Sequence, residues 1–395
     1  MEPIKVDNCQ QASKQASKQA SKQASKQASK QASKQASKQR QSGIELLRIF
    51  AAMGVVILHY NNGMMGGGMK YAAFGSANSI LLYILEAFCV AAVNIFVLIN
   101  GYFDLRSNRR DLIKPIKLIV QVMLFNLAYY LLRVVIGHID LSISHIIGSM
   151  IPANWFIILY CALYMVSPFL NITLNQITMK EYHVLLGIAV GIFSFYPMVV
   201  DNLEIWTGKV WMGLSSIGMY GSEYGYTIVN FVLMYIIGAY LQRFGWKISK
   251  PCLLIAFALN TMLLVVWGLT DTYLGHKEIL AWEYCSTFVV FEAVVTFLLF
   301  SKLKFQNRMI NKLAKASLCV YLVHIYFLPH LRIKEIILMN SPGITLAHLT
   351  LCVLVIYAFA YVVNLVYLVI TCPFYEKIEE IWPQHSYNLG NRKEC

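Results

Sequence analysis

Two ionisable side chains lie inside the first long apolar run of the chain, GIELLRIFAAMGVVILHYNNG. Arg48 and His59 are eleven residues apart, close to three turns of an α-helix, so a helix would place both on one face about 16 Å apart along its axis. A neutral imidazole can take a proton from a hydroxyl, and a guanidinium can hold an anion. The spacing suits base chemistry at one end of a helix and anion binding at the other. A snorkelling arginine with an interfacial histidine would give the same pattern.

Four other residues in or beside apolar runs are candidates for binding a substrate: Glu86, Trp155, Tyr321 and His324. Ser317, Tyr321 and His324 follow the spacing i, i+4, i+7, which places them on one stripe of a helix. That stripe can line the path of an acceptor, and hydrogen bonding between helices explains it equally well. Trp155 suits either a platform for sugar rings or a belt of aromatic residues at a membrane interface.

A basic segment, DLRSNRRDLIK, follows the second apolar run. Its Arg106 and Arg109 form an Arg-x-x-Arg pair, and guanidinium groups suit phosphate because of their planar, forked geometry. Ordinary positive charge beside a membrane accounts for the pair equally well. The nine cysteines form no CxxC pair or zinc-type spacing, so no metal site is predicted.

The composition indicates the elements that must hold these residues. Of the 395 residues 58% are hydrophobic and 13% charged, against about 25% charged in soluble proteins. The net charge of +13 does not point to nucleic acid, because the Lys and Arg residues lie at the ends of apolar runs. We therefore expect an all-α, polytopic integral membrane protein with about ten transmembrane helices. The apolar runs lie near 44–61, 80–103, 112–137, 154–170, 183–200, 226–242, 251–270, 281–301, 311–329 and 345–371.

The distribution of positive charge predicts the orientation. With the N-terminus inside, only six of the 33 Lys and Arg residues fall on the outer side: Lys70, Arg133, Lys209, Lys277, Arg332 and Lys334. This bias predicts a multi-pass protein of the cytoplasmic membrane with both termini in the cytoplasm. The expected organisation is a disordered tail over 1–42, a ten-helix transmembrane domain over 43–372 and a cytoplasmic tail over 373–395.

The N-terminal tail contains seven uninterrupted copies of Ala-Ser-Lys-Gln between Ala12 and Gln39. The repeat has no hydrophobic face, so it is expected to be disordered. The codons GCA-AGC-AAG-CAA encode one copy and are the tetranucleotide GCAA repeated three times. We hypothesise that slippage in this tract switches translation on and off, as is typical of bacterial surface-structure genes.

Several segments together resemble the membrane-bound acyltransferase-3 family, the O-acyltransferases of bacterial surface polysaccharides. Arg-x10-His in the first helix is similar to the family's signature, as are NIFVLINGYF, NWFIILYCALYMVSPFLN and ASLCVYLVH in later helices. The resemblance covers about 44–371. Asn100 stands where the family usually has Ser, and Cys319 where it usually has Gly.

The resemblance implies that an acyl group, commonly acetyl from acetyl-CoA, enters from the cytoplasm and reaches a hydroxyl of a surface glycan such as lipooligosaccharide or capsule. His59 would act as base or carry the acyl group, and Arg48 would orient the donor. Arg106 and Arg109 would bind the polyanionic CoA. The expected partners are membrane lipids, the acyl-CoA donor and the glycan acceptor, with no nucleic acid and no permanently bound cofactor.

Two other function classes fit a chain of this kind. A lipid-linked glycan flippase or transporter would carry internal repeats with broken helices in matching positions, and no clear repeat is visible. A membrane-embedded glycan polymerase usually needs a large outer loop, and the longest outer segment, 201–225, is short.

Overall fold

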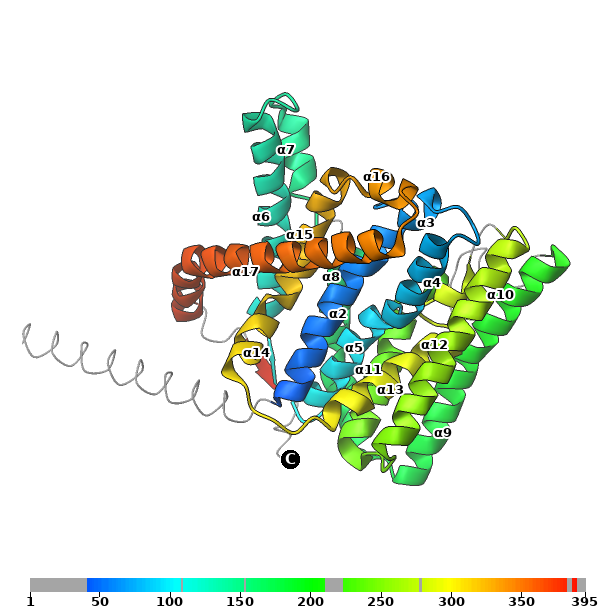
Figure 1. The fold of residues 1–395 in the computed structure, drawn as a ribbon. Coiled ribbons are helices and arrows are strands. Elements are labelled where there is room, and N and C mark those ends of the chain that lie inside the picture. The colour runs from blue at the N-terminus through cyan, green and yellow to red at the C-terminus, as the bar shows by residue number, and fades with distance from the viewer. Residues whose placement is uncertain are drawn as a thin grey trace, which may run out of the picture.

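The computed structural model describes residues 41–107, 109–152, 154–209, 223–276, 279–381 and 386–388, and almost all of them are helical (Figure 1). Within these ranges, nine helical segments are long and apolar enough to cross a membrane, and α11 is a shorter apolar helix. These ten segments coincide with the ten predicted runs, so the prediction of an all-α, multi-pass membrane protein is confirmed.

The ten segments have the following bounds: α2 (Ser42–Asn61); α4 (Ala77–Cys89) with α5 (Ala92–Asp104); α6 (Ile113–Val135); α8 (Trp155–Gln176); α9 (Met179–Val190) with the π-helix η1 (Gly191–Phe195) and α10 (Tyr196–Thr207); α11 (Ile228–Phe244); α12 (Lys250–Tyr273); η3 (Leu280–Trp282) with α13 (Thr287–Ser301); α14 (Arg308–Leu313) with η4 (Ala314–Ala316), α15 (Ser317–Phe327) and η5 (Leu328–His330); and α17 (Pro342–Ile381). Short helical turns connect some of them: α3 (Gly68–Tyr71), α7 (Ile143–Ser149), η2 (Glu223–Gly225) and α16 (Ile333–Leu338).

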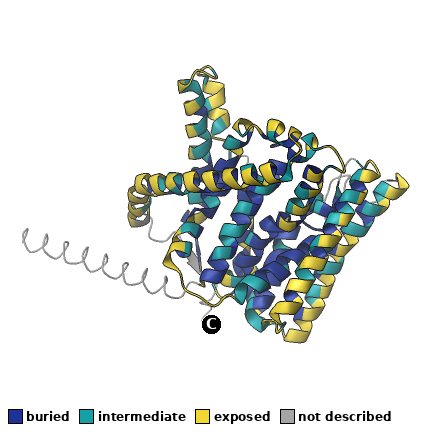
Figure 2. Cartoon of the chain, in the orientation of Figure 1, coloured by how far each residue is buried: buried dark blue, intermediate teal, exposed yellow. Residues whose placement is uncertain are grey.

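Helix α2 lies at the centre of the bundle, where it contacts α4, α5, α13, α14, α15 and α17. Figure 2 shows the buried residues gathered along α2, α5 and α11, whereas α9, α12 and α17 expose much of their surface. The exposed residues of these outer helices are largely apolar, such as Val184, Leu259 and Val355. An apolar outer surface is what a protein surrounded by lipid requires.

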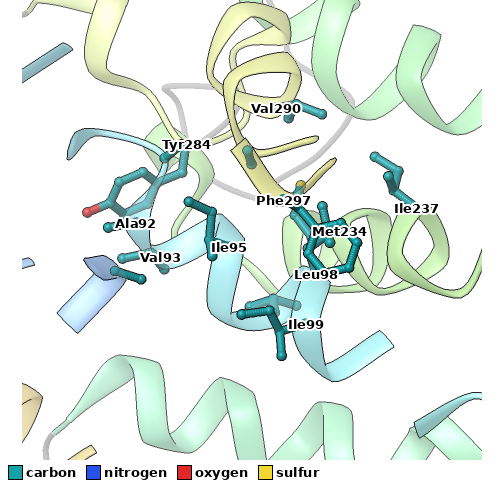
Figure 3. Packing of buried hydrophobic residues seen from close by; sticks show 14 of the residues in the cluster. Ala92, Val93, Ile95, Leu98, Ile99, Met234, Ile237, Tyr284, Val290 and Phe297 are labelled. Carbon is teal, nitrogen blue, oxygen red and sulfur yellow. The ribbon is translucent and has the colours of Figure 1, made fainter. Parts of the chain in front are cut away.

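Close contact between α5 and α11 forms part of the inner core. At Gly101 the backbone of α5 approaches α11 so closely that a Cβ atom would lie 2.2 Å from the Tyr235 carbonyl oxygen. At Gly238 of α11 a Cβ atom would lie 2.2 Å from the Leu98 carbonyl oxygen. Small residues at facing positions allow such an approach between membrane helices. Figure 3 shows apolar side chains of both helices packed around this contact.

Helix α8 is longer than the sequence pattern indicates. The predicted run ends near 170, just after Pro168, and proline normally stops a helix, yet α8 continues to Gln176. Proline cannot donate to the carbonyl four residues before it, which is that of Tyr164. That carbonyl instead accepts from Arg110 Nε at 3.1 Å and from Ser167 Oγ at 3.0 Å. The fourth helix therefore extends beyond the end of the predicted run, because other donors replace the missing one.

The two termini relate differently to the predicted domain limits. Residues 1–40, including the Ala-Ser-Lys-Gln repeat, lie outside the described residues, and α2 begins at Ser42. At the other end α17 continues past residue 372 to Ile381, with Pro373 inside it. Strand β2 (Ser386–Asn388) then pairs antiparallel with β1 (Arg109–Asp111). Residues 386–388 thus pair with the segment that follows α5.

Candidate active site

His59 and His324 are brought together by the crossing of α2 and α15. Nδ1 of His59 and Nε2 of His324 share a hydrogen bond, and the two rings stack with centroids 4.7 Å apart and an interplanar angle of 18°. His324 is fully buried, whereas His59 is partly exposed. The contact joins the residue expected as base to a residue expected to bind the substrate.

The hydrogen bonds of His324 determine the tautomers of both rings. Nδ1 of His324 lies 3.1 Å from the carbonyl oxygen of Val320, which can only accept, so this nitrogen carries the proton. In the neutral ring Nε2 of His324 is then an acceptor, and Nδ1–H of His59 donates to it. This leaves Nε2 of His59 with a free lone pair. A neutral imidazole held in this tautomer can accept a proton from a hydroxyl.

Small and β-branched residues allow α2 and α15 to approach at the histidine pair. Ala52 and Val56 of α2 lie in one buried cluster with Cys319 and Val320 of α15. Cys319 is fully buried, so its small side chain fills the interface between the two helices. The packing fixes the relative rotation of the helices that carry the two imidazoles.

Glu86 is attached to the same end of α2. The amide nitrogen of Asn61 donates to Glu86 Oε2 at 2.9 Å and to the Leu82 carbonyl oxygen at 3.2 Å. The carboxyl also lies within electrostatic range of the hydroxyls of Tyr226 and Tyr284. Asn61, two residues after His59, was not among the predicted site residues. The signal for it was a second polar residue at the end of the first apolar run.

Tyr321 and Trp155 are linked through the first residues of α8. The Tyr321 hydroxyl donates to Asn154 Oδ1 at 3.1 Å, and the same oxygen accepts from the backbone nitrogen of Ile157 at the start of the helix. The Trp155 ring lies 4.6 Å from that of Tyr226 and 6.3 Å from that of Tyr284. The expected binding residues therefore border one aromatic region, with Tyr321 and His324 on the same stripe of α15 as predicted.

Arg48 lies near the opposite end of α2. Its Nη1 is 3.3 Å from Glu45 Oε1, and the guanidinium carbon is 5.7 Å from the centre of the Phe103 ring. Asp104 and Tyr160 are within electrostatic range of the same guanidinium. The single helix α2 thus carries Arg48 and His59 at opposite ends, as the spacing predicted.

Arg110 is a buried cation that was not among the predicted site residues. Its Nη2 lies 3.6 Å from Asp104 Oδ2 and donates to Ser167 Oγ at 2.8 Å, while its Nη1 donates to the Ser107 carbonyl oxygen at 2.8 Å. Only about 1% of its side chain is exposed. Arg110 also donates to the Tyr164 carbonyl oxygen, as described above. These contacts connect the end of α5 to the middle of α8. The sequence pattern gave no means of distinguishing it from the neighbouring arginines.

The predicted donor pair lies on the same loop as Arg110. The exposed Arg106 faces Gln242 at the end of α11. With the amide oriented to accept, its oxygen lies 3.0 Å from Nε and 3.2 Å from Nη2 of Arg106. Arg109 belongs to β1, where its backbone pairs with Asn388. Its side chain lies outside the described part of the structure.

Among the described residues no three His, Cys, Asp or Glu side chains are grouped as metal ligands.

Comparison with known proteins places these helices in a family. A family model described as an acyltransferase domain, that of acyltransferase-3, matches residues 41–367. The chain matches no curated protein and no solved structure. The family match covers every helix from α2 through most of α17, including His59, His324 and Arg48. The protein therefore belongs to the membrane-bound acyltransferase-3 family and is an acyltransferase.

Proposed function

We propose that this protein transfers an acetyl group from acetyl-CoA at the cytoplasmic face of the cytoplasmic membrane to a hydroxyl of a cell-surface glycan on the outer side. The observation that carries the proposal is the histidine pair. The hydrogen bond between Nδ1 of His59 and Nε2 of His324 leaves a proton acceptor, Nε2 of His59, at the opposite end of α2 from Arg48. The predominance of Lys and Arg in alternate loops supports an orientation with the Ser42 end of α2 inside.

The chemistry is the conversion of a thioester and an alcohol into an ester and a thiol. Nε2 of His59 takes the proton of the acceptor hydroxyl as its oxygen attacks the acyl carbonyl carbon. The new C–O bond forms, the C–S bond of the donor breaks, and the thiolate leaves. The proton held by His59 then neutralises the thiolate, directly or through water, which returns the imidazole to its starting tautomer.

The donor is proposed to approach along the face of α2 that carries Arg48. A guanidinium at that end can form charge-assisted hydrogen bonds to a phosphate of CoA. Arg106 and Arg109 are proposed to add positive charge on the same side. Glu86, Trp155, Tyr321 and the residues around them are proposed to hold the acceptor, since carboxyl, amide and aromatic groups suit a sugar.

A transport experiment across the membrane tests this arrangement. Inside-out vesicles that contain the acceptor on their luminal side should incorporate label from external [acetyl-14C]acetyl-CoA into the enclosed glycan, and right-side-out vesicles should not. Incorporation of label only when the donor and the acceptor are on the same side of the membrane would contradict the proposal. Neither the transporter nor the polymerase alternative gains support from the family match.

Phase-variable expression is a separate proposal, supported by the perfect Ala-Ser-Lys-Gln repeat alone. Sequencing of the gene tests it. Tandem GCAA units that differ in number among isolates are expected, whereas scrambled synonymous codons would contradict slippage.

A further inference from the structure

A cavity of about 790 Å³ opens on the side of the bundle where α6, α15, η5 and α17 meet. Its walls are largely aromatic and aliphatic, and they include Phe125 and Leu132 of α6, Phe327 of α15, and Phe359 and Val363 of α17. Leu132 and Phe359 are 56% and 47% exposed, so the cavity borders the surface that would face lipid. Its volume lies in the range of small-molecule sites rather than of packing defects. We call it the lateral groove.

One end of the lateral groove is basic. Arg133, His138 and His330 line it, and none of the described residues that line the groove carries a carboxylate. Arg133 lies over the Tyr129 ring at 5.9 Å, and none of the described residues forms an ion pair with it. It is one of only six Lys and Arg residues expected on the outer side. A cation of this kind in the last turn of α6 would meet an anionic group at the level of the lipid headgroups.

A smaller cavity lies beside the lateral groove, on the side of the histidine pair. A second cavity of about 190 Å³ shares Phe125 and Tyr326 with it and is lined by Asn154. Asn154 accepts from the Tyr321 hydroxyl, and the rings of Tyr321 and His324 are 6.0 Å apart. A ligand whose anionic group rested at Arg133 would therefore lie next to the residues that contact the histidine pair. Figure 1 shows α17 crossing beside α6 and α15, the helices whose side chains line the groove.

We propose that the lateral groove binds a lipid phosphate with a single long chain, the membrane anchor of the acceptor glycan. The phosphate would lie against Arg133, and the first segment of the chain would lie along Phe327 and Phe359, whose rings contact each other edge to face. The groove presents one cation beside one apolar strip, so it suits one phosphate and one chain. The identity of the attached glycan rests on the proposed function, whereas the binding of the lipid does not.

The test uses photochemical labelling of the purified full-length protein in phosphatidylcholine nanodiscs. The probe is a polyprenyl diphosphate with a photoreactive group on the chain, and the labelled peptides are mapped by mass spectrometry. We expect labelling within α6, α15 and α17, displaced by unmodified polyprenyl diphosphate but not by phosphatidylglycerol. Equal displacement by phosphatidylglycerol, or labelling spread over the exposed faces of α9 and α12, would mean that the site is ordinary surrounding lipid and would overturn the proposal.

Two variants and one control sharpen the test. Arg133→Gln should lower labelling about tenfold, the effect of losing one charge-assisted hydrogen bond. Val363→Trp should lower it by filling the apolar part, with no change in charge. Arg332→Gln removes a charge from the expected outer side outside the groove, at a side chain that is 79% exposed, and should leave labelling unchanged. If Arg133→Gln and Val363→Trp both elute as monodisperse proteins and are labelled as strongly as the wild type, the proposed site is refuted. His59→Ala should keep full labelling, so a failure of the proposed transferase activity would be seen separately.

Discussion

The imidazole of His324 determines which nitrogen of His59 is free to act as a base. The two residues are 265 positions apart in the chain, yet their rings stack and share a hydrogen bond across α2 and α15. Because Nδ1 of His324 donates to Val320, only Nε2 of His324 remains to accept from His59. His324 is therefore a positioning residue for the base rather than only part of an acceptor path.

Substitution of His324 should slow transfer without removing the base. His324→Ala takes away the acceptor for Nδ1–H of His59, so we expect kcat to fall about tenfold, the effect of one neutral hydrogen bond. His324→Gln supplies an amide oxygen that can accept, so it should retain more activity. Initial rates in membranes with matched protein levels test both variants. Identical kcat values for His324→Ala and the wild type would contradict the positioning role.

Substitution of Arg48 should affect the donor rather than the acceptor. Arg48→Gln removes a charge-assisted contact to phosphate, so the KM for acetyl-CoA should rise about tenfold or more while the KM for the acceptor stays unchanged. Lys180→Gln, at an exposed cation near the same expected side, is the control. An unaltered KM for acetyl-CoA would leave Arg48 with a topological role only.

The number of helices and their order follow from hydropathy, and all ten apolar runs coincide with apolar helices in the structure. Arg48 and His59 could be placed on one helix because they are close in sequence. The contact of His59 with His324 could not be predicted, since it depends on which distant helices pack together. Both histidines could be singled out as ionisable residues within apolar runs and by the family resemblance of their segments, but neither signal pairs them with each other.

Two features of the fold depart from local sequence rules. Pro168 predicts a helix end, but Arg110 and Ser167 supply donors to the Tyr164 carbonyl, and α8 continues. The pairing of β1 with β2 joins residues nearly 280 positions apart, and neither strand has a local pattern that indicates it. In both cases a partner remote in sequence decides the local structure.

Arg110 should be needed for stability. Arg110→Met leaves the Asp104 carboxylate without its buried cation and removes a donor from the Tyr164 carbonyl, at a cost of about 3–5 kcal/mol. We expect the variant to lose its monodisperse elution at a lower temperature than the wild type in detergent. Arg106→Met, at an exposed side chain, serves as the control. Equal thermal stability of Arg110→Met and the wild type would contradict the account of α5 and α8.

The close approach of α5 and α11 gives a prediction with an internal control. Gly238→Ala would place a Cβ atom 2.2 Å from the Leu98 carbonyl oxygen, so the helices must separate at a cost of about 1–3 kcal/mol. Gly187→Ala in α9 meets nothing within 4 Å and should preserve stability or raise it slightly. Thermal melts of both variants in detergent test the difference. Equal melting temperatures would show that the α5–α11 contact tolerates a side chain.

The most direct test of the central claim is proton NMR of the surface glycan from cells that carry the wild-type protein, no protein or His59→Ala. Removal of a general base slows a reaction by about 10²–10⁴-fold, so O-acetyl signals should be present with the wild type and absent from the other two. Protein levels and monodispersity of His59→Ala should match the wild type. Full O-acetylation with His59→Ala would contradict the role of His59. An identical acylation pattern in all three strains, with a loss of surface glycan in the deletion strain alone, would instead indicate a flippase.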